Sequence, residues 1–302
     1  MAFALRARLG KPCQDAYRLR MEKLRVLSLN IWNRSGPWEA RLPLIRAELT
    51  RHGPDLVGLN EVLRMESMGL CQATEIAQGL GYTIAYGPAL DIGNGLFMGN
   101  AILSRYPLSD CGHSALPVSS ADDGRSVVFA RAHTPHGTVP FFVTHFSWEL
   151  HQGATRVRQA RALVTAISAF APIEQEGSAS ANAPALPPIV CGDFNADSEA
   201  DEVRYLKGLA TVEGESAYFA DAYAWRGTAP GHTWCERNPF TAPVLGPDRR
   251  LDYVFVRGPD DFGRGRVLDA QVVCDRADEH GVFPSDHFGV LVDVQASVDA
   301  NG

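Results

Sequence analysis

The feature that most constrains this chain is a set of short apolar segments that end abruptly in polar side chains. The clearest is residues 187–203, PPIVCGDFNADSEADEV, where three apolar residues run directly into Gly, Asp, Phe and Asn. Gly, Asp and Asn all suit tight turns, so this segment alone is equally consistent with a surface turn. Its meaning depends on whether other apolar segments end in the same way.

Five further apolar segments carry a polar group at one end. The polar residues of all six segments are Asn30, Glu61, His145, Asp193 with Asn195, Asp252, and Asp286 with His287. Each alone has an ordinary structural explanation: a turn residue, a surface charge, a hydrogen-bonded core histidine, or a partner for a nearby Arg. Six coincident endings instead indicate a shared site, because ligand sites form where rigid strand ends converge.

Strand-like and helix-like segments alternate along the chain. Strands are predicted at 24–30, 54–61, 82–87, 99–107, 125–134, 137–147, 189–193, 251–258, 266–274 and 288–296, and helices at 37–53, 68–79, 154–170 and 199–209. The strands around His136-Gly137 are expected to form a hairpin. Without an internal repeat or a second core, this order indicates one α/β domain.

The predicted domain occupies residues 24–296. A basic N-terminal extension (1–23) precedes it, a tail (297–302) follows it, and the Ala, Ser and Pro-rich stretch 174–188 is predicted to be a flexible surface loop. No apolar run approaches the roughly 20 residues that a transmembrane helix needs. The six cysteines lack zinc spacing and suit a reducing compartment. The expected location is therefore cytoplasmic; the sequence indicates no oligomeric state.

Charge is distributed unevenly. Residues 1–25 contain seven Lys or Arg and two acidic residues, a net +5, which leaves −12 on the rest of a chain whose net charge is −7. A nonspecific duplex binder usually presents a strongly basic face. Nucleic acid is therefore a partner that the composition does not favour, although a local basic groove is compatible with this total.

The residue types at the six strand ends fit one kind of chemistry. Oxygen ligands without thiolates suit Mg²⁺ or Mn²⁺ rather than zinc, and Mg²⁺ typically uses one or two carboxylates together with water and substrate phosphate. Neutral Asn and His side chains can donate hydrogen bonds to a phosphate without adding repulsion. An Asp–His pair can fix the tautomer of an imidazole that faces a phosphoryl group.

The segments SLNIW, LNEV, GNAILSRYP, THFS, GDFNADS, RRLDYVFV and SDHFGV, in this order, resemble the endonuclease/exonuclease/phosphatase (DNase-I-like) superfamily. The resemblance covers roughly residues 24–296. It implies a four-layer α/β/β/α sandwich of two mixed β-sheets, with metal-dependent phosphoester hydrolysis at one edge. One departure is Trp32, which stands where some abasic endonucleases have an aspartate; this weakens the nuclease assignment but not the hydrolase one.

The resemblance also implies a role for each strand-end residue. Glu61 corresponds to the main Mg²⁺ carboxylate, with Asn30 close to the metal and Asp286 as a further metal-site carboxylate. Asp193 would orient or deprotonate the attacking water, Asn195 would hold that water or a phosphate oxygen, and His145 would donate to the phosphate or leaving oxygen. His287, oriented by Asp252, would act from the other side. Asp193 and His287 both remain candidates for the general base.

The substrate is less constrained. Arg156 begins an RxxQ motif in a predicted helix, and this motif resembles one in sphingomyelinase-like members of the superfamily. Arg156 is either a substrate contact or a solvated charge on the helix. Trp234 either covers the site or packs as a cap on the core. The leading hypothesis is a Mg²⁺-dependent phosphodiesterase or phosphatase for a small-molecule or lipid-head-group phosphate; no convincing membrane-docking element supports a lipid. A nuclease is the alternative, and an inactive binding module would be expected to lack Glu61, Asp193 or His287.

Overall fold

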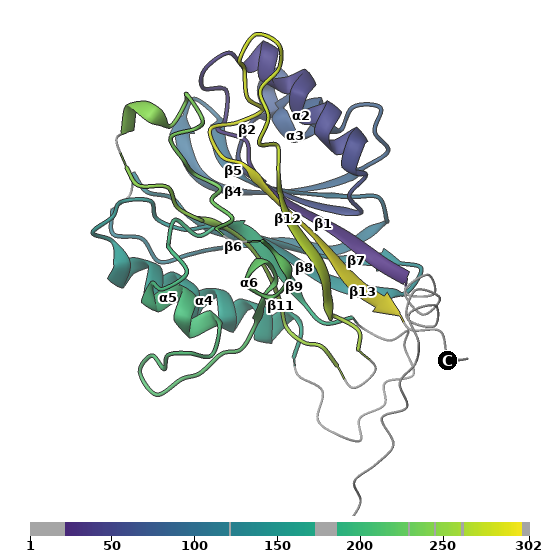
Figure 1. Ribbon diagram of the computed structural model, residues 1–302, viewed down its shortest axis with the longest axis vertical. Helices are drawn as coiled ribbons and strands as arrows, with labels where there is room; N and C mark the ends of the chain where they lie inside the picture. The colour runs from purple at the N-terminus through teal and green to yellow at the C-terminus, as the bar shows by residue number, and fades with distance from the viewer. Residues whose placement is uncertain are drawn as a thin grey trace, which may run out of the picture.

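The structure is a computed structural model that describes residues 22–120, 122–172, 186–228, 230–244, 246–260 and 263–297. Two β-sheets stack face to face, with helices on their outer faces (Figure 1). The predicted N-terminal extension, the 174–188 loop and the C-terminal tail lie almost entirely outside the described residues. No helix in the described ranges is long and apolar enough to cross a membrane.

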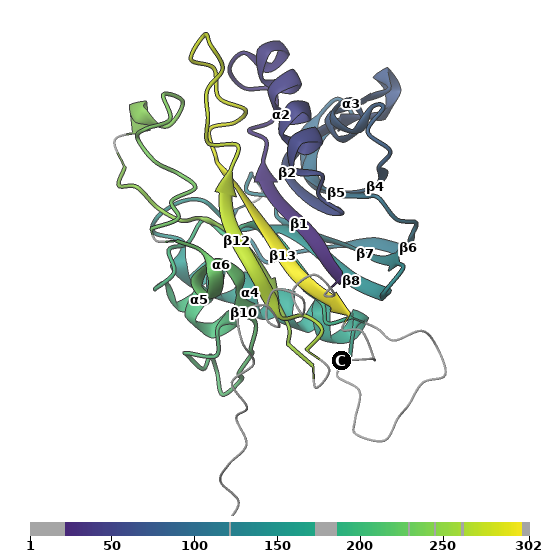
Figure 2. The ribbon, with the colours of Figure 1, turned by 45° about the vertical axis from the view of Figure 1, so that its right-hand side comes forward.

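The first sheet has seven strands in the order β12-β13-β1-β2-β5-β4, with β3 paired to β2. Their bounds are Val267–Val273 (β12), Gly289–Ser297 (β13), Glu22–Asn30 (β1), Leu56–Met65 (β2), Leu96–Ser104 (β5), Thr83–Gly93 (β4) and Leu70–Cys71 (β3). β1 runs parallel to β2, with Asn30 opposite Asn60, and antiparallel to β13. Figure 2 shows β12, β13 and β1 side by side.

The second sheet has six strands in the order β10-β11-β9-β8-β7-β6. Their bounds are Ala220–Asp221 (β10), Asp252–Val256 (β11), Ile189–Asp193 (β9), Gly137–His145 (β8), Ser126–Thr134 (β7) and Leu108–Ala115 (β6). β8 and β9 are parallel, whereas β11 is antiparallel to β9. The predicted hairpin is confirmed, because β7 and β8 pair antiparallel across a tight turn.

Helices cover the outer face of each sheet: α2 (Trp38–His52) and α3 (Gln72–Ala77) that of the first, and α4 (Gly153–Phe170) and α5 (Asp201–Leu206) that of the second. The short α6 (Ala222–Arg226) packs instead against β12 and β11 and contributes Ala222 and Tyr223 to the core between the sheets. The 3-10 turns are η1 (Glu66–Met68) and η2 (Ala242–Val244). α2 ends where Gly53 adopts a left-handed backbone (φ 56°) and its N–H closes on the Leu49 carbonyl, a conformation that costs glycine little.

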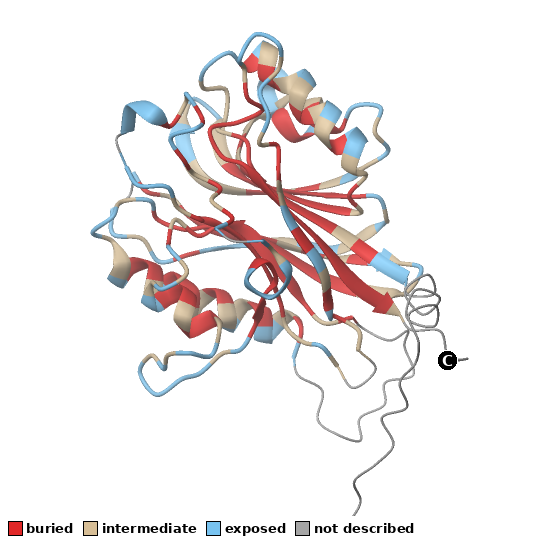
Figure 3. Cartoon of the chain, viewed as in Figure 1, coloured by how far each residue is buried: buried red, intermediate tan, exposed pale blue. Residues whose placement is uncertain are grey.

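Three apolar clusters separate four layers. The central cluster lies between the sheets, with Val26 and Ile102 from the first sheet and Phe141 and Val254 from the second. A second cluster packs α2 and α3 onto the first sheet, and a third packs α4 and α5 onto the second. Figure 3 shows the buried strands between partly exposed helices. This arrangement confirms the predicted α/β/β/α sandwich of two mixed sheets.

Some predicted boundaries are wrong for local reasons. β2 does not end at Glu61 but continues to Met65 through a β-bulge between Leu59 and Val62. The helix predicted at 68–79 is limited to α3, because the preceding residues form η1 and β3. β6 and α6 were not predicted; the mostly exposed residues of β6 lack the apolar alternation that marks a strand.

Candidate active site

Strand topology brings the polar ends together although they lie far apart in the sequence. The parallel pairs β1–β2 and β8–β9 deliver their carboxyl ends to one edge, which positions Asn30, His145 and Asp193 there. The antiparallel strands β11 and β13 deliver their amino ends to the same edge. Asp252 therefore lies opposite Asp193, and residues 286–287 lie just before β13.

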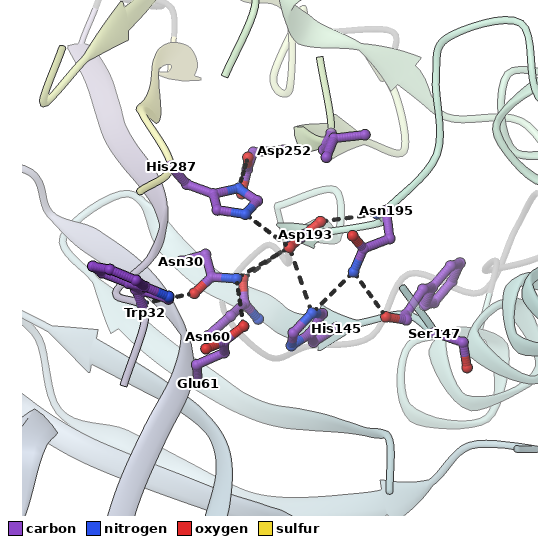
Figure 4. Close-up of polar contacts among 12 residues, drawn as sticks. Asn30, Trp32, Asn60, Glu61, His145, Ser147, Asp193, Asn195, Asp252 and His287 are labelled. Atoms are coloured by element: carbon purple, nitrogen blue, oxygen red, sulfur yellow. Dashed lines mark hydrogen bonds and ion pairs between the residues drawn. The ribbon is translucent and has the colours of Figure 1, made fainter. Parts of the chain in front are cut away.

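Asp193 is at the centre of this group (Figure 4). Its Oδ1 accepts a hydrogen bond from the backbone N–H of Asn195 (2.8 Å), and its Oδ2 accepts one from Asn30 Nδ2 (3.1 Å). Oδ2 also lies 3.4 Å from His145 Nε2 and 3.6 Å from His287 Nε2. A buried carboxylate thus faces two imidazoles and two hydrogen-bond donors.

The Asp252–His287 pair controls the proton balance beside Asp193. The Nδ1 atom of His287 lies 2.8 Å from Asp252 Oδ2, and both side chains are buried. Burial alone lowers the pKa of His287, but the charges of Asp252 and Asp193 raise it well above its ordinary value. Burial likewise raises the pKa of Asp193 to about 7; the His287 charge opposes this rise and the Asp252 charge adds to it. His287 is therefore a cationic donor at neutral pH, and Asp193 can exchange a proton there.

His145 has the opposite tendency. Burial and the adjacent Arg125 charge hold the pKa of His145 well below its ordinary value. The Nη1 atom of Arg125 lies 3.2 Å from His145 Nδ1, and its guanidinium is paired with the buried Asp123 carboxylate. Asn195 Nδ2 is 3.1 Å from His145 Nε2 and donates to the Phe146 carbonyl. His145 is thus a neutral imidazole beside the Asp193 carboxyl.

A second set of oxygen ligands lies on the other side of Asn30. Glu61 occupies the bulge in β2 with a left-handed backbone (φ 59°), an uncommon conformation for a residue other than Gly. Its Oε1 accepts from Asn30 Nδ2 (3.2 Å) and its Oε2 from Asn33 Nδ2 (2.9 Å). Burial raises the pKa of Asp286 to about 6; the His287 charge opposes this rise, and the Glu61 charge adds to it. The Glu61 and Asp286 carboxylates therefore repel each other where little water is present to screen their charges.

This donor chemistry fits a hard divalent cation. Glu61 and Asp286 supply carboxylate oxygens without thiolates, and a bound cation would relieve the repulsion between them. The Asn30 amide faces Glu61 with its Nδ2, while its Oδ1 accepts the Trp32 N–H (2.9 Å). Asp193, Asp252 and His287 also offer ligand atoms within 4.8 Å of one another. In that group, however, the Nδ1 atom of His287 is already engaged by Asp252, which favours proton transfer over metal binding. Oδ1 of Asp252 is buried without a hydrogen-bond partner among the described residues.

Several residues of the site were not assigned a role from the sequence. Asn60 Oδ1 accepts from the backbone N–H of Asp193 (3.0 Å), and Asn60 Nδ2 donates to Asn100 Oδ1 (2.8 Å). These buried amides cross from one sheet to the other and orient Asp193. In the sequence each of them is an Asn beside apolar residues. Asn residues in turns often have the same neighbours, so the pattern did not mark them as part of a site. Arg125 was missed because a single Arg before a strand carries no pattern.

The two predicted substrate contacts have different surroundings. Trp234 is half-buried, and its ring meets that of His287 edge-on at a centroid distance of 4.9 Å. Arg156 does not reach the cluster: it is buried, its Nε donates to Glu202, and its Nη1 donates to the carbonyls of Ser147 and Glu149. Both expectations for Arg156 are corrected, because a solvated helix charge would be exposed and a substrate contact would have a free guanidinium.

Gly192 of the GDFN segment lies directly against the neighbouring strand. A Cβ there would lie 1.9 Å from the Thr144 carbonyl oxygen, so the close approach of β8 requires glycine. Phe194 is fully buried, and its ring packs against Phe146, Tyr253 and Phe255. The segment therefore has a polar tip anchored by one aromatic side chain.

Solved structures with a similar fold include D. rerio TDP2 complexed with a single-strand DNA product (TM-score 0.67, 18% identity, covering 90% of this chain and 99% of that one). An endonuclease/exonuclease/phosphatase from Beutenbergia cavernae has a TM-score of 0.65 and 24% identity, with 90% and 71% covered. The human Nocturnin catalytic domain with a bound sulfate anion has a TM-score of 0.64 and 18% identity, with 90% and 93% covered.

At these identities the likeness concerns the fold. Comparison with curated proteins finds no match. Residues 27–287 match the Endonuclease/Exonuclease/phosphatase family, which is most of the chain and includes every strand-end residue described above. The chain therefore belongs to the Endonuclease/Exonuclease/phosphatase family, whose members are metal-dependent hydrolases of phosphoric esters.

Proposed function

We propose that this chain is a Mg²⁺-dependent phosphodiesterase or phosphatase that acts on a small molecule or a lipid head group, with Mn²⁺ able to replace Mg²⁺. One observation carries the proposal: the buried Asp193 carboxyl lies between the Asp252–His287 pair on one side and the Asn30–Glu61 pair on the other. Proton-transfer groups and hard oxygen ligands thus share one edge, as hydrolysis of a phosphoester requires.

Glu61 and Asp286 are the residues that would hold the metal, with Asn30 close to it through its hydrogen bond to Glu61. When bound there, Mg²⁺ supplies charge neutralisation for the phosphoryl oxygens. The chain itself keeps these ligands in place: Asn33 holds one carboxylate oxygen of Glu61, and Ser285 Oγ lies 3.2 Å from Asp286 Oδ1. The raised pKa of Asp286 implies that its ligand form is lost as pH falls through about 6.

Asp193 is the better candidate for the general base, and His287 for a phosphate donor. A carboxyl with a pKa of about 7 can accept a proton from water at neutral pH, whereas His287 is already protonated between two carboxylates. Asp252 keeps Nδ1 of His287 engaged, so Nε2–H is directed toward Asp193 and the space where the phosphate would bind. Asn195 and neutral His145 complete the polar wall.

Two features support a small leaving group. Trp234, in contact with His287, lines a pocket of about 550 Å³ together with Glu236, Arg237 and Thr241. The acidic body of the chain repels an extended polyanion. A nuclease remains the second candidate, because a structure of similar fold is complexed with a single-strand DNA product.

The test compares substrates and metals on the purified full chain. Small phosphodiesters, small phosphomonoesters and supercoiled plasmid are assayed with Mg²⁺, with EDTA, and after replacement by Mn²⁺ or Zn²⁺; Asp193→Asn is the control for contaminating hydrolases. We expect activity that EDTA abolishes and Mg²⁺ or Mn²⁺ restores, with kcat/KM higher for a small ester than for plasmid nicking. Restoration by Zn²⁺ alone would contradict the metal assignment, and equally efficient nicking would favour the nuclease.

A further inference from the structure

Arg41 of α2 is a fully buried cation whose partners are backbone carbonyls. All the hydrogen-bond partners that the described parts of the chain give it are backbone carbonyls, and it is among the largest fully buried side chains. Its guanidinium donates to the carbonyls of Ile31 (2.8 Å), Trp32 (3.3 Å), Asn33 (3.0 Å), Ser35 (2.8 and 3.1 Å) and Pro284 (3.0 Å). So many charge-assisted bonds from one side chain hold those carbonyls in one arrangement.

These carbonyls belong to two segments that are distant in the sequence. Residues 31–35 follow Asn30, and Pro284 directly precedes residues 285–287. The Nη1 atom of Arg41 bonds to Ile31 O and Pro284 O at once, so a single nitrogen joins the two segments. Ser285 Oγ adds a parallel link to the Asn30 carbonyl (2.7 Å). The segment that carries Asp286 is therefore tied to the segment that begins at Asn30.

The 31–35 segment is also strained. Trp32 and Asn33 have φ angles of 54° and 38°, in the left-handed region that residues other than Gly seldom adopt. Such conformations persist where the surroundings over-determine them. Arg41 bonds to the carbonyls of both residues, and the conformation directs Asn33 Nδ2 onto Glu61 Oε2 (2.9 Å). The strained backbone thus reaches the expected metal ligand, and Figure 4 shows Trp32, Asn30 and Glu61 together.

The charge of Arg41 is accommodated locally. Burial lowers the pKa of Arg41 to about 10, while the charges of Asp286 and Glu61 act to raise it, so the guanidinium remains protonated at neutral pH. The rings of Trp32 and Trp38 have their centroids 5.1 and 5.3 Å from its central carbon, within the range of cation–π attraction. The planar guanidinium of Arg41 therefore offers several N–H donors and a positive charge near the Glu61 and Asp286 carboxylates.

We propose that Arg41 is a positioning residue that joins the 31–35 and 284–287 segments and so sets the spacing of Glu61 and Asp286 for one cation. The inference rests on the proposed function, because it takes those two carboxylates as metal ligands. Loss of a residue that orients metal ligands typically costs about 10- to 100-fold in metal affinity. Lysine keeps the charge of Arg41 but lacks the planar guanidinium that donates to several carbonyls at once.

The experiment uses Arg41→Lys, Arg41→Met and the matched control Arg46→Met. Arg46 lies on the same helix and also donates to backbone carbonyls, those of Glu75, Ile76 and Gln78, away from the catalytic edge. Mn²⁺ alone is titrated calorimetrically into each protein, and kcat, KM and the melting temperature are measured separately. We expect the Kd for Mn²⁺ to rise about 10- to 100-fold in both Arg41 variants with reduced kcat, and to stay at the wild-type value in Arg46→Met.

A wild-type Kd in a folded Arg41→Lys would overturn the proposal, as would an equal rise in Arg46→Met, since general destabilisation would then suffice. Arg41→Gln provides a milder cut if neither Arg41→Lys nor Arg41→Met folds, because Gln keeps a planar amide donor but cannot bond to both segments at once. It should also weaken Mn²⁺ binding, and an unchanged Kd there would count against the inference. If the wild-type chain binds no Mn²⁺ and hydrolyses no phosphoester, the proposed function itself is wrong.

Discussion

Replacing Asp193 with Asn exchanges one carboxyl oxygen for an NH₂ group, so the side chain at the centre of the site no longer titrates while its volume changes little. Asn can keep its Oδ1 as the acceptor for the Asn195 N–H, but its new amide group then faces the Asn30 Nδ2 donor, 3.1 Å from the atom it replaces. Two N–H donors that face each other in a buried site should lower the free energy of unfolding by about 1–3 kcal/mol. The variant also removes the candidate base, so kcat should fall by about 10²- to 10⁴-fold.

The stability effect should depend on pH with a definite sign. The folded-state pKa of Asp193, about 7, lies above its ordinary value of 3.8, so between these values the folded protein holds a proton that the unfolded chain has lost. Stability from this group therefore falls as pH rises, by about 1.4 kcal/mol per pH unit at most. Between about pH 5 and pH 7 the wild type should lose roughly 2–3 kcal/mol that Asp193→Asn does not lose.

Urea denaturation followed by circular dichroism, in the presence of a chelator, measures both proteins across this range. The variant should be the less stable protein near pH 5, with the gap closing or reversing near pH 8. The Asp193 charge also raises the pKa of His287, so the difference between the two curves reports the coupled Asp193–His287 pair. Parallel curves would refute the raised pKa and with it the role of Asp193 as base. Near-wild-type kcat in a variant that melts early would mean that GDFN is only a turn.

Three further changes test the anchor, the metal ligand and the corrected arginine. Phe194→Ala should cost about 3–5 kcal/mol, because the ring is fully buried among three aromatic side chains; urea denaturation measures this, and an unchanged midpoint would exclude the anchor role. Glu61→Gln should shift the Mg²⁺ titration midpoint of the activity upward, and an unchanged midpoint would remove Glu61 from the metal site. Arg156→Met should lower stability by about 3–5 kcal/mol by leaving Glu202 buried and unpaired, with KM unchanged. A raised KM at unchanged stability would restore Arg156 as a substrate contact.

The sequence alone was enough to predict which polar residues meet at one edge of the sheets, and its resemblance to a family implied the sandwich. Short apolar segments indicate strands because the side chains of buried strands are apolar. A polar residue at the end of such a segment is therefore conspicuous. Asn30, His145, Asp193 and Asp252 were recognised in this way, and the structure brings them together through contacts of 3.6 Å or less. The order of the motifs added the family and hence the four layers.

The tertiary structure alone decided which polar groups support those residues. Asn60 looks like an ordinary strand residue until the two sheets stack and bring it to Asp193. Arg125 looks like an ordinary loop residue until β7 pairs with β8 and brings it to His145. Arg156 is conspicuous in the sequence, but in the structure its guanidinium forms a buried ion pair with Glu202. The physical reason is that apolar periodicity depends on local burial, whereas a pairing between polar groups depends on which strands become neighbours. Arg41 illustrates this: its link to Pro284 spans most of the chain and depends on the pairing of β13 with β1.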